Sequence, residues 1–220
     1  MKQNTFFTII YLLIALANIA AGFLDNDLLR YIFKPLIMIS LLTWSVFWPD
    51  RRFVQRKVVF QIGMALACAG DIFLMLDGFF LQGLGAFLIM QLLYVATFWK
   101  EIRFPFAAGP LLFRVFGMTA VLVLILIVVL PHMTDPVLKA AVTVYAFVIT
   151  LMALFASLRN SQVSNTSFIW VLSGAGLFMV SDTLIAFNAF VTKLADSHFW
   201  VMSTYMIAQF AIVRGMLKTR

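Results

Sequence analysis

The segment "GDIFLMLDG" (Gly70 to Gly78) decides the fold, because it joins an apolar run to a tight-turn dipeptide. Asp77-Gly78 is a strong turn signal, so we expect a helix over 58–76 and a helix over 79–99 to form a hairpin. Asp71 lies inside the apolar run, where an acid costs about 2.5–3.5 kcal/mol in a bilayer. Ionisable residues at such depth usually have a function, so the segment predicts both a membrane hairpin and a site.

The composition extends this interpretation to the whole chain. Of 220 residues, 64% are hydrophobic and only 11% are charged, whereas soluble domains carry about 25% charged residues. The apolar runs are long and unbroken, unlike the alternating segments of about 10 residues in a transmembrane barrel. At about 20 residues per span, the sequence predicts an all-α, polytopic transmembrane bundle, with residues 1–220 forming a single transmembrane domain.

Apolar windows predict eight helices, with polar or Pro/Gly-containing breaks between them. The windows cover residues 6–24, 29–48, 58–76, 79–99, 111–131, 137–158, 168–188 and 199–217. The first window also resembles a signal peptide, because small residues near Ala21 follow an apolar core. Its apolar run is longer than the usual 7–15 residues, so we interpret it as an uncleaved helix, with cleavage as the alternative.

The net charge of +7 indicates membrane orientation rather than nucleic-acid binding, because the basic residues lie in loops beside apolar runs. Eight helices place both termini on one side, and 12 of the 16 Lys and Arg residues belong to that side. This asymmetry predicts cytoplasmic termini in a bacterial inner membrane. The residues on the terminal side are Lys2, Arg51, Arg52, Arg56, Lys57, Lys100, Arg103, Arg114, Arg159, Arg214, Lys218 and Arg220; those opposite are Arg30, Lys34, Lys139 and Lys193.

A faint internal duplication relates the two halves of the chain. "GDIFLMLD" (70–77) resembles "SDTLIAFN" (181–188) at an offset of 111 positions. The same offset carries the first three helices close to the fifth, sixth and seventh, and it maps Lys34 onto Tyr145. Four helices separate the copies, so the predicted repeats, 1–110 and 111–220, are parallel and related by an axis along the membrane normal.

Two acids, one from each predicted repeat, are the candidate catalytic groups. Asp71 and Asp182 each lie about six residues from the outer end of a predicted helix, which puts both about 9 Å below that end. A buried carboxyl pair can keep one member protonated as an acid while the other stays ionised. The plainer interpretation is that Asp71 pairs with Lys34 and Asp182 only hydrogen-bonds neighbouring helices.

Further polar residues share this level. Lys34 either reaches the interface with its long side chain or binds an acid or a lipid phosphate. Tyr205 and Gln209 share one helix face, as do Gln91 and Tyr94; hydrogen bonding between helices is the plainer interpretation of both pairs.

Several other chemistries lack their residues. The single cysteine, Cys68, excludes an internal disulfide, and two histidines, His132 and His198, cannot make a three-histidine zinc site. The chain has no Gly-x-Ser-x-Gly elbow and no Gly-rich phosphate loop, and Cys68-Ala69-Gly70-Asp71 stands where an intramembrane aspartyl protease has Gly-x-Gly-Asp. We therefore expect no metal and no cofactor.

Five motifs in order resemble the YhhN family of lysoplasmalogenase-like membrane proteins. They are "FKPL" (33–36), "GDIFLML" (70–76), "GAFLIMQLLY" (85–94), "SDTLIAFN" (181–188) and "STYMIAQ" (203–209). Gln91 departs from the family pattern, which often has His at that position, so a proton-carrying role there is lost or has passed to another residue.

The resemblance implies a hydrolase that cleaves the vinyl ether of lysoplasmalogens to a fatty aldehyde and a glycerophospho-alcohol. Asp71 and Asp182 suit the acid and base roles by analogy with glycoside hydrolysis. The expected partners are a lysophospholipid substrate and membrane lipids, and the sequence leaves the oligomeric state open. A proton-coupled carrier that uses the same acids and a non-enzymatic lipid sensor are the alternatives. The expected substrate-binding residues are Lys34, Asp77, Gln91, Tyr94, Tyr145, Asn188, Tyr205 and Gln209.

Overall fold

Eight α-helices make up the computed structural model, which describes residues 2–48, 54–104 and 107–218. No strand occurs within these ranges. The helices are α1 (Lys2–Phe23), α2 (Asp27–Val46), α3 (Val54–Phe73), α4 (Phe80–Trp99), α5 (Ala108–Val129), α6 (Pro136–Leu158), α7 (Asn165–Phe190) and α8 (Ser197–Leu217), with a 3₁₀ turn, η2 (Leu130–His132), after α5. The predicted all-α bundle of eight helices is confirmed.

The helix ends follow local signals in the sequence. Asn26 caps α2 by accepting a hydrogen bond from the backbone N–H of Leu29 at 3.1 Å. Asp135 caps α6 in the same way, ahead of Pro136 at the first helical position. Gly78 has φ +83° in the α3–α4 turn, a conformation that glycine adopts without steric cost. The predicted turn at Asp77-Gly78 is therefore confirmed.

The extent of α3 is the main difference from the predicted boundaries. The sequence window ran to residue 76, whereas α3 ends at Phe73. Leu74, Met75 and Leu76 form turns whose N–H groups bond back to the carbonyls of Gly70, Ile72 and Phe73. Leu74 and Met75 are partly buried and Leu76 is exposed, but all three are apolar, so hydropathy alone does not separate them from the helix.

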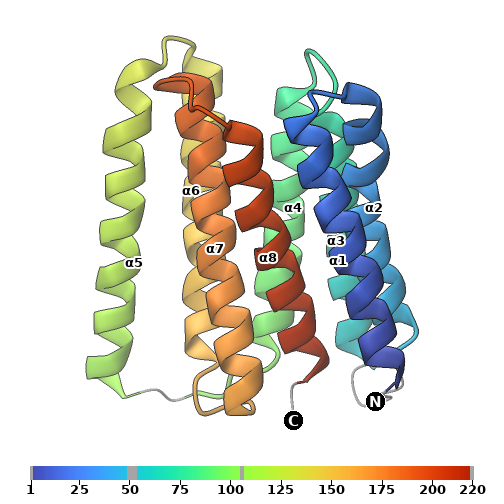
Figure 1. The fold of residues 1–220 in the computed structure, drawn as a ribbon. Helices are drawn as coiled ribbons and strands as arrows, with labels where there is room; N and C mark the ends of the chain where they lie inside the picture. The colour runs from blue at the N-terminus through green and yellow to red at the C-terminus, as the bar shows by residue number, and fades with distance from the viewer. Residues whose placement is uncertain (1, 49–53, 105–106, 219–220) are drawn as a thin grey trace.

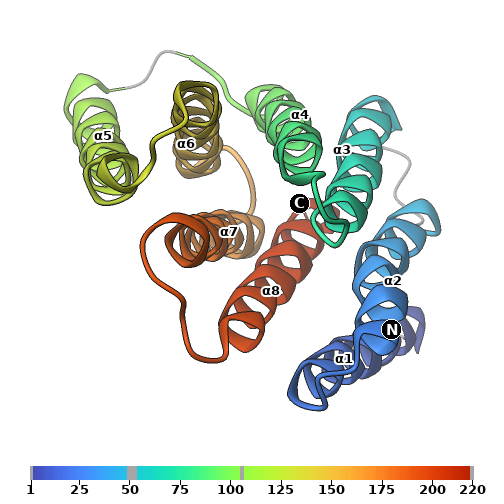
Figure 2. The ribbon, with the colours of Figure 1, turned by 90° about the horizontal axis from the view of Figure 1, so that it is seen from above.

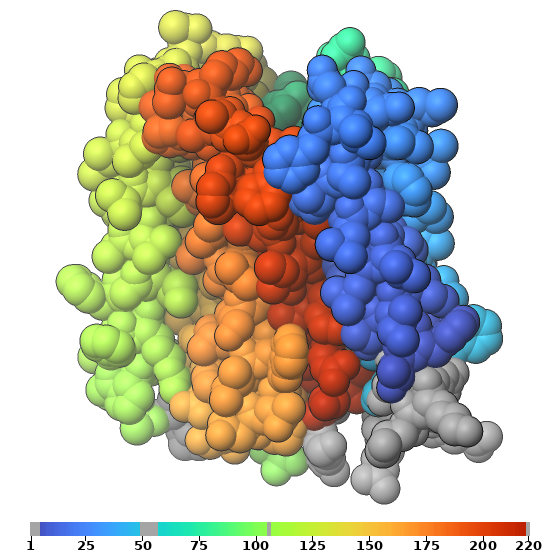
Figure 3. All heavy atoms as spheres, viewed as in Figure 1, coloured from blue at the N-terminus to red at the C-terminus, as the bar shows by residue number. Residues whose placement is uncertain are grey.

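The helices run alternately up and down, and both termini lie at one end of the bundle (Figure 1). Seen from above, α1 to α4 form one group and α5 to α7 another, with α8 beside α7 and close to α1 and α2 (Figure 2). Seven helices, α1–α4 and α6–α8, contribute residues to one hydrophobic core. Helix α5 packs outside it and lines one edge of the molecule (Figure 3).

The outer surface is that of a membrane protein. Within the part of the chain that the structure describes, six helices are long and apolar enough to cross a membrane, namely α1, α2, α4, α5, α6 and α7. Side chains such as Phe113, which is 79% exposed on α5, would be costly in water and are favourable in lipid. Helix α8 is less apolar, but much of it is buried between other helices. Helices α8 and α3 lie alongside the other six, with their axes in the same general orientation (Figure 1).

The packing pairs of the first half recur in the second. Helices α1·α2, α2·α3 and α3·α4 pack together, as do α5·α6, α6·α7 and α7·α8, and α4·α6 has its counterpart in α8·α2. This order agrees with two parallel repeats, although the duplication itself stays a prediction. In this order α2 packs on α3 and on α8, and α8 packs on α7.

Candidate active site

Asp71 occupies the last turn of α3 and is only 1% exposed. The hydroxyl of Tyr205, on α8, donates a hydrogen bond of 2.6 Å to its Oδ2. The Nζ of Lys34, on α2, lies 4.0 Å from its Oδ1. The ion pair that the plainer interpretation expected is therefore present, in a buried setting that also includes a tyrosine from the other half of the chain.

Lys34 points inward rather than toward the membrane surface. Its side chain is 15% exposed, and its ammonium faces Asp71. The next residue, Pro35, has no backbone N–H, and its carbonyl accepts a contact from the Cys68 thiol at 3.7 Å. The interpretation in which Lys34 only reaches for the interface is thus wrong.

Asp182 lies two turns before the end of α7 and is partly buried. Tyr145, on α6, donates a short hydrogen bond to its Oδ2, and the side-chain amide of Gln91, on α4, donates to the same oxygen at 3.5 Å. Both recorded bonds reach Oδ2, so Oδ1 stays available. Among the described residues, the structure records an ion pair for Asp71 but not for Asp182.

A third buried pair lies between α4 and α8, because the Tyr94 hydroxyl donates to Gln209 Oε1 at 3.3 Å. Tyr94 lies one turn from Gln91, and Gln209 lies one turn from Tyr205. The three polar pairs, Asp182–Tyr145, Asp71–Tyr205 and Tyr94–Gln209, therefore follow one another through the core. The second amide atoms, Gln91 Oε1 and Gln209 Nε2, are buried and make no hydrogen bond. Such atoms are available to a polar ligand or a water molecule.

An aromatic cluster of three rings, from α4, α7 and α8, is built around Tyr205, the hydrogen-bond partner of Asp71. The rings of Phe87 and Phe178 lie 6.1 Å apart, and each lies about 6 Å from the ring of Tyr205, at 6.0 and 5.8 Å. Phe87 also packs on Gly70, where an added Cβ would lie 2.7 Å from the ring. Asp71 and Asp182 thus have different hydrogen-bond partners, and a chamber shared by the two acids stays a prediction.

Two cavities of opposite chemistry adjoin this arrangement. The polar cavity, of 230 Å³, is lined by Asp27, Arg30, Tyr31, Lys34, Leu74, Met75 and His198. The apolar cavity has a volume of 40 Å³ on the same measure and is partly open to the surroundings; it is lined by Leu74, Phe80, Leu84, Phe87, Val142, Tyr145, Asp182, Ile185, Ala186 and Phe190. Asp182 thus faces a hydrocarbon-lined space directly, whereas Asp71 adjoins the polar cavity through Lys34.

Two predicted residues lie apart from this cluster. Asp77 is exposed on the turn between α3 and α4. The Asn188 side chain accepts a hydrogen bond from the backbone N–H of Leu194 at 2.9 Å and so fastens the α7–α8 loop. The structure brings together the other eight, namely Asp71, Asp182, Lys34, Gln91, Tyr94, Tyr145, Tyr205 and Gln209, through the contacts above.

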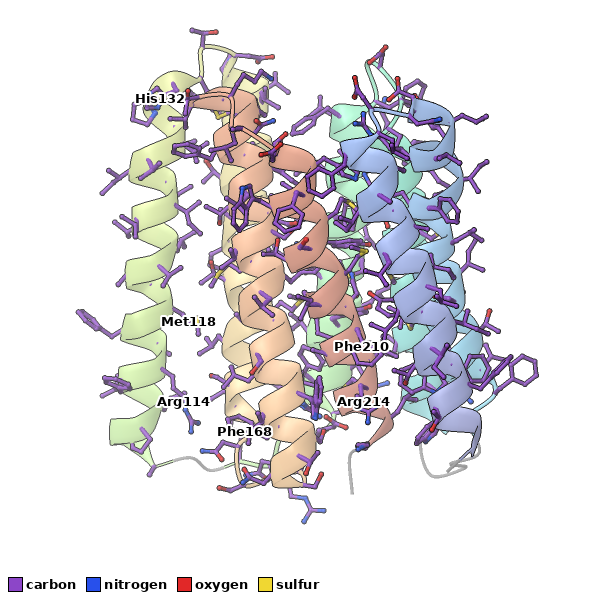
Figure 4. All side chains as sticks on the ribbon, viewed as in Figure 1. Arg114, Met118, His132, Phe168, Phe210 and Arg214 are labelled. Atoms are coloured by element: carbon purple, nitrogen blue, oxygen red, sulfur yellow. The ribbon has the colours of Figure 1, made fainter. Side chains whose placement is uncertain are left out.

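The wall of the polar cavity contains two basic residues that no sequence signal assigned to the site, Arg30 and His198. Arg30 was counted only as an orientation charge, but it bonds Asp25 at 2.8 Å and Asp27 at 3.0 Å and lines the cavity. His198 was considered only as a possible zinc ligand, but it lies at the start of α8 and lines the same cavity. His132 lies in the turn η2, just after α5, at the end of the bundle opposite the termini (Figure 4). The described residues contain no cluster of three metal-ligand side chains.

These features define a class: a polytopic helical membrane protein with one buried and one partly buried carboxyl group, each held by its own hydrogen-bond partners, near one end of the bundle. The chain belongs to the YhhN family, whose model matches residues 29–216.

Characterised relatives carry lysoplasmalogenase names. The chain is 29% identical to human lysoplasmalogenase TMEM86B over 185 residues, which is 84% of this chain and 73% of that protein. It is 31% identical to the pig (Sus scrofa) TMEM86B, covering 67% of this chain and 59% of the relative, and 26% identical to human lysoplasmalogenase TMEM86A, covering 72% and 65%. The chain thus spans roughly 59–73% of the length of these relatives. No solved structure matches the chain significantly.

Proposed function

We propose that this protein is a membrane-embedded hydrolase that cleaves the vinyl ether of lysoplasmalogens, giving a fatty aldehyde and a glycerophospho-alcohol. The observation that carries the proposal is Asp182, a carboxyl group hydrogen-bonded by Tyr145 at the wall of an apolar cavity. Membership of the YhhN family and the names of the relatives support the same reaction.

Asp182 is the proposed proton donor. A carboxyl group in an apolar space with no cation beside it favours its neutral form, and the unbonded Oδ1 is the oxygen that carries the proton. Transfer of this proton to the outer carbon of the vinyl ether uses the alkene electron pair and leaves an oxocarbenium ion. Water adds to that ion, its proton returns to a carboxylate, and the hemiacetal collapses with cleavage of the carbon–oxygen bond.

Asp71 is the proposed ionised partner. A lysine ammonium within about 4–6 Å favours the charged form of a carboxyl group, and the Nζ of Lys34 lies 4.0 Å from Asp71. Its negative charge, fixed by Tyr205, would stabilise the cation and accept the proton of the attacking water. Lys34 has a second role in meeting the substrate phosphate from the polar cavity.

The test is aldehyde release by the purified protein from lysoplasmenylethanolamine in detergent or nanodiscs, with and without a chelator. We expect release in both conditions. The matched control for variants of the two acids is Asp135→Asn, an exposed acid whose capping role asparagine can fill. If the native, folded protein releases no aldehyde from any vinyl-ether lipid, the proposal is wrong.

A proton-coupled carrier is the competing proposal from the sequence. A carrier site must open to both sides, whereas Arg159 and Glu101 form a buried ion pair of 2.6 Å at the end of the bundle that holds the termini. Arg159 also donates to Ser167 at 2.8 Å, which donates to the carbonyl of Gly215 at 2.7 Å. This network joins α4, α6, α7 and α8, and it favours an enzyme that opens at one end.

We also propose that the termini are cytoplasmic and that the protein resides in a bacterial inner membrane. Arg114 and Arg214 both lie toward the end with the termini (Figure 4), as the charge asymmetry requires. Arg51, Arg52 and Arg220, which contribute to that asymmetry, lie outside the described residues. Labelling of single cysteines at the exposed residues 77 and 160 with an impermeant reagent, in a variant without Cys68, would check it: residue 77 should react from outside the cell and residue 160 only after the membrane is opened.

A further inference from the structure

Leu74 lines both cavities, the polar one and the apolar one. It follows the last residue of α3, and its side chain packs on α4 at Gly83, where an added Cβ would lie 2.6 Å from Leu74 Cδ2. Any larger residue at position 83 would therefore push Leu74 out of place. Leu74 therefore forms part of the boundary between the two cavities, and the absence of a side chain at Gly83 leaves room for it there.

The polar cavity carries the groups that bind an anion. Three of its lining residues, Arg30, Lys34 and His198, have basic side chains. The contact of Lys34 with Asp71 is long, at 4.0 Å, so its ammonium has donors to spare. Arg30 uses its terminal nitrogens on Asp25, Asp27 and the Gly22 carbonyl, whereas its Nε is buried without a hydrogen bond. Phosphate is the anion that such donors suit.

The apolar cavity suits a hydrocarbon chain. Leu84, Phe87, Val142, Ile185, Ala186 and Phe190 supply most of its wall, and the polar groups among its lining residues are Asp182 and Tyr145. Its space is partly open to the surroundings, so a chain can lie in it without complete enclosure. Phe80 and Phe190, from the upper ends of α4 and α7, meet edge to face at 5.8 Å and form part of this wall.

We propose that the two cavities are the two ends of one binding site for a single-chain phospholipid, and that Leu74 sets the position of the lipid along it. The phosphate binds at Lys34 and Arg30, the glycerol crosses Leu74, and the chain enters the apolar cavity. This rests on the proposed function in one respect: the first carbons of the chain, which hold the vinyl ether in the substrate, then lie beside Asp182. Leu74 is thus a specificity-determining residue that keeps the scissile bond at the acid.

The test measures binding, not turnover, with a lysophosphoethanolamine whose chain is attached by a saturated ether that no hydrolysis of a vinyl ether can cleave. Two fragments accompany it: an alkylglycerol without phosphate, and glycerophosphoethanolamine without a chain. Linked ends of one site bind about 10²–10⁴-fold more tightly than either fragment alone. Inorganic phosphate is included to separate a site for a lipid head group from a site for the free ion.

The variants are Leu74→Trp, Gly83→Ala and Lys34→Gln, with Leu92→Trp as the control, because Leu92 lies exposed on α4. We expect Leu74→Trp and Gly83→Ala to weaken binding of the intact lipid at least tenfold and to leave glycerophosphoethanolamine unchanged. Lys34→Gln should weaken the intact lipid and leave the alkylglycerol unchanged. Leu92→Trp should change none of them.

Two results would overturn the inference. In one, the intact lipid binds no more tightly than its fragments, or the Leu74 and Gly83 variants bind it like the native protein. In the other, inorganic phosphate binds as tightly as the lipid and the chain adds nothing. Binding of the saturated ether lipid by a protein that releases no aldehyde would refute the proposed hydrolase and leave this inference standing.

Discussion

Replacement of Asp182 by asparagine should abolish most of the activity with little effect on the fold. Both recorded hydrogen bonds to Asp182 end on Oδ2. An asparagine carbonyl oxygen can occupy that position and keep both bonds, while its NH₂ takes the place of Oδ1. The variant therefore preserves the packing and loses only the transferable proton. Since general acid catalysis contributes about 10²–10⁴-fold to a rate, the barrier should rise by about 3–5 kcal/mol.

The same substitution at Asp71 should behave differently. Tyr205 donates to Oδ2 of Asp71 and Lys34 faces Oδ1, so an asparagine must present its NH₂ either to the ammonium or to the tyrosine. It also leaves a largely buried lysine without its carboxylate. We expect Asp71→Asn to lower the thermal stability, and breaking a buried ion pair in this way typically costs about 3–5 kcal/mol.

The assay combines initial rates of aldehyde release with thermal unfolding followed by helical circular dichroism, both in the same detergent. Asp182→Asn should retain the native unfolding temperature and lose at least 100-fold in rate, and Asp135→Asn should retain both. A folded Asp182→Asn protein with more than a tenth of the native rate would refute the assignment of Asp182 as proton donor.

Three other changes test the packing around the site. Gly174→Ala should destabilise the protein by about 1–3 kcal/mol, because the new Cβ would lie 2.8 Å from a backbone carbonyl of α8. Gly176→Ala should be neutral or stabilising, because its Cβ would meet nothing within 4 Å. The unfolding temperatures of the two variants test this difference. Asn18→Leu should be neutral or stabilising by the same measurement, since Asn18 is fully buried and neither atom of its side-chain amide makes a hydrogen bond. A marked loss of stability would contradict this prediction and indicate a partner for that amide. Lys34→Met should unfold at a lower temperature than the double variant Lys34→Met/Asp71→Asn, because the double variant leaves no buried charge unpaired; equal temperatures would contradict the importance of this ion pair.

The fold could be predicted from the sequence because its signals are local. Unbroken apolar runs give the helices, and Asp77-Gly78 gives the hairpin. The end of α3 could not be predicted in this way, since Leu74 to Leu76 are apolar although their backbone turns. A hydropathy window reports where side chains are apolar, and it does not report where the chain changes direction.

The candidate site was predictable in its members and not in its pairings. The depth of Asp71 and Asp182 in apolar runs and the one-turn spacing of Tyr205 and Gln209 placed the right side chains in the interior. The partner of each acid depends on how helices far apart in sequence rotate against one another, and one sequence carries no signal for that. The packing of Phe87 against Phe178 could not be predicted either, because a phenylalanine in a membrane helix can equally well face the lipid.

The hydrogen bonds of the two acids also cross between the halves of the chain. Asp71 belongs to the first half and is held by Tyr205 from the second, while Asp182 belongs to the second and is held by Gln91 from the first. Severed between α4 and α5 and made as two polypeptides, the molecule should be inert as either fragment and regain its chemistry only when both are produced in the same membrane. Neither fragment contains a complete set of partners for its own acid.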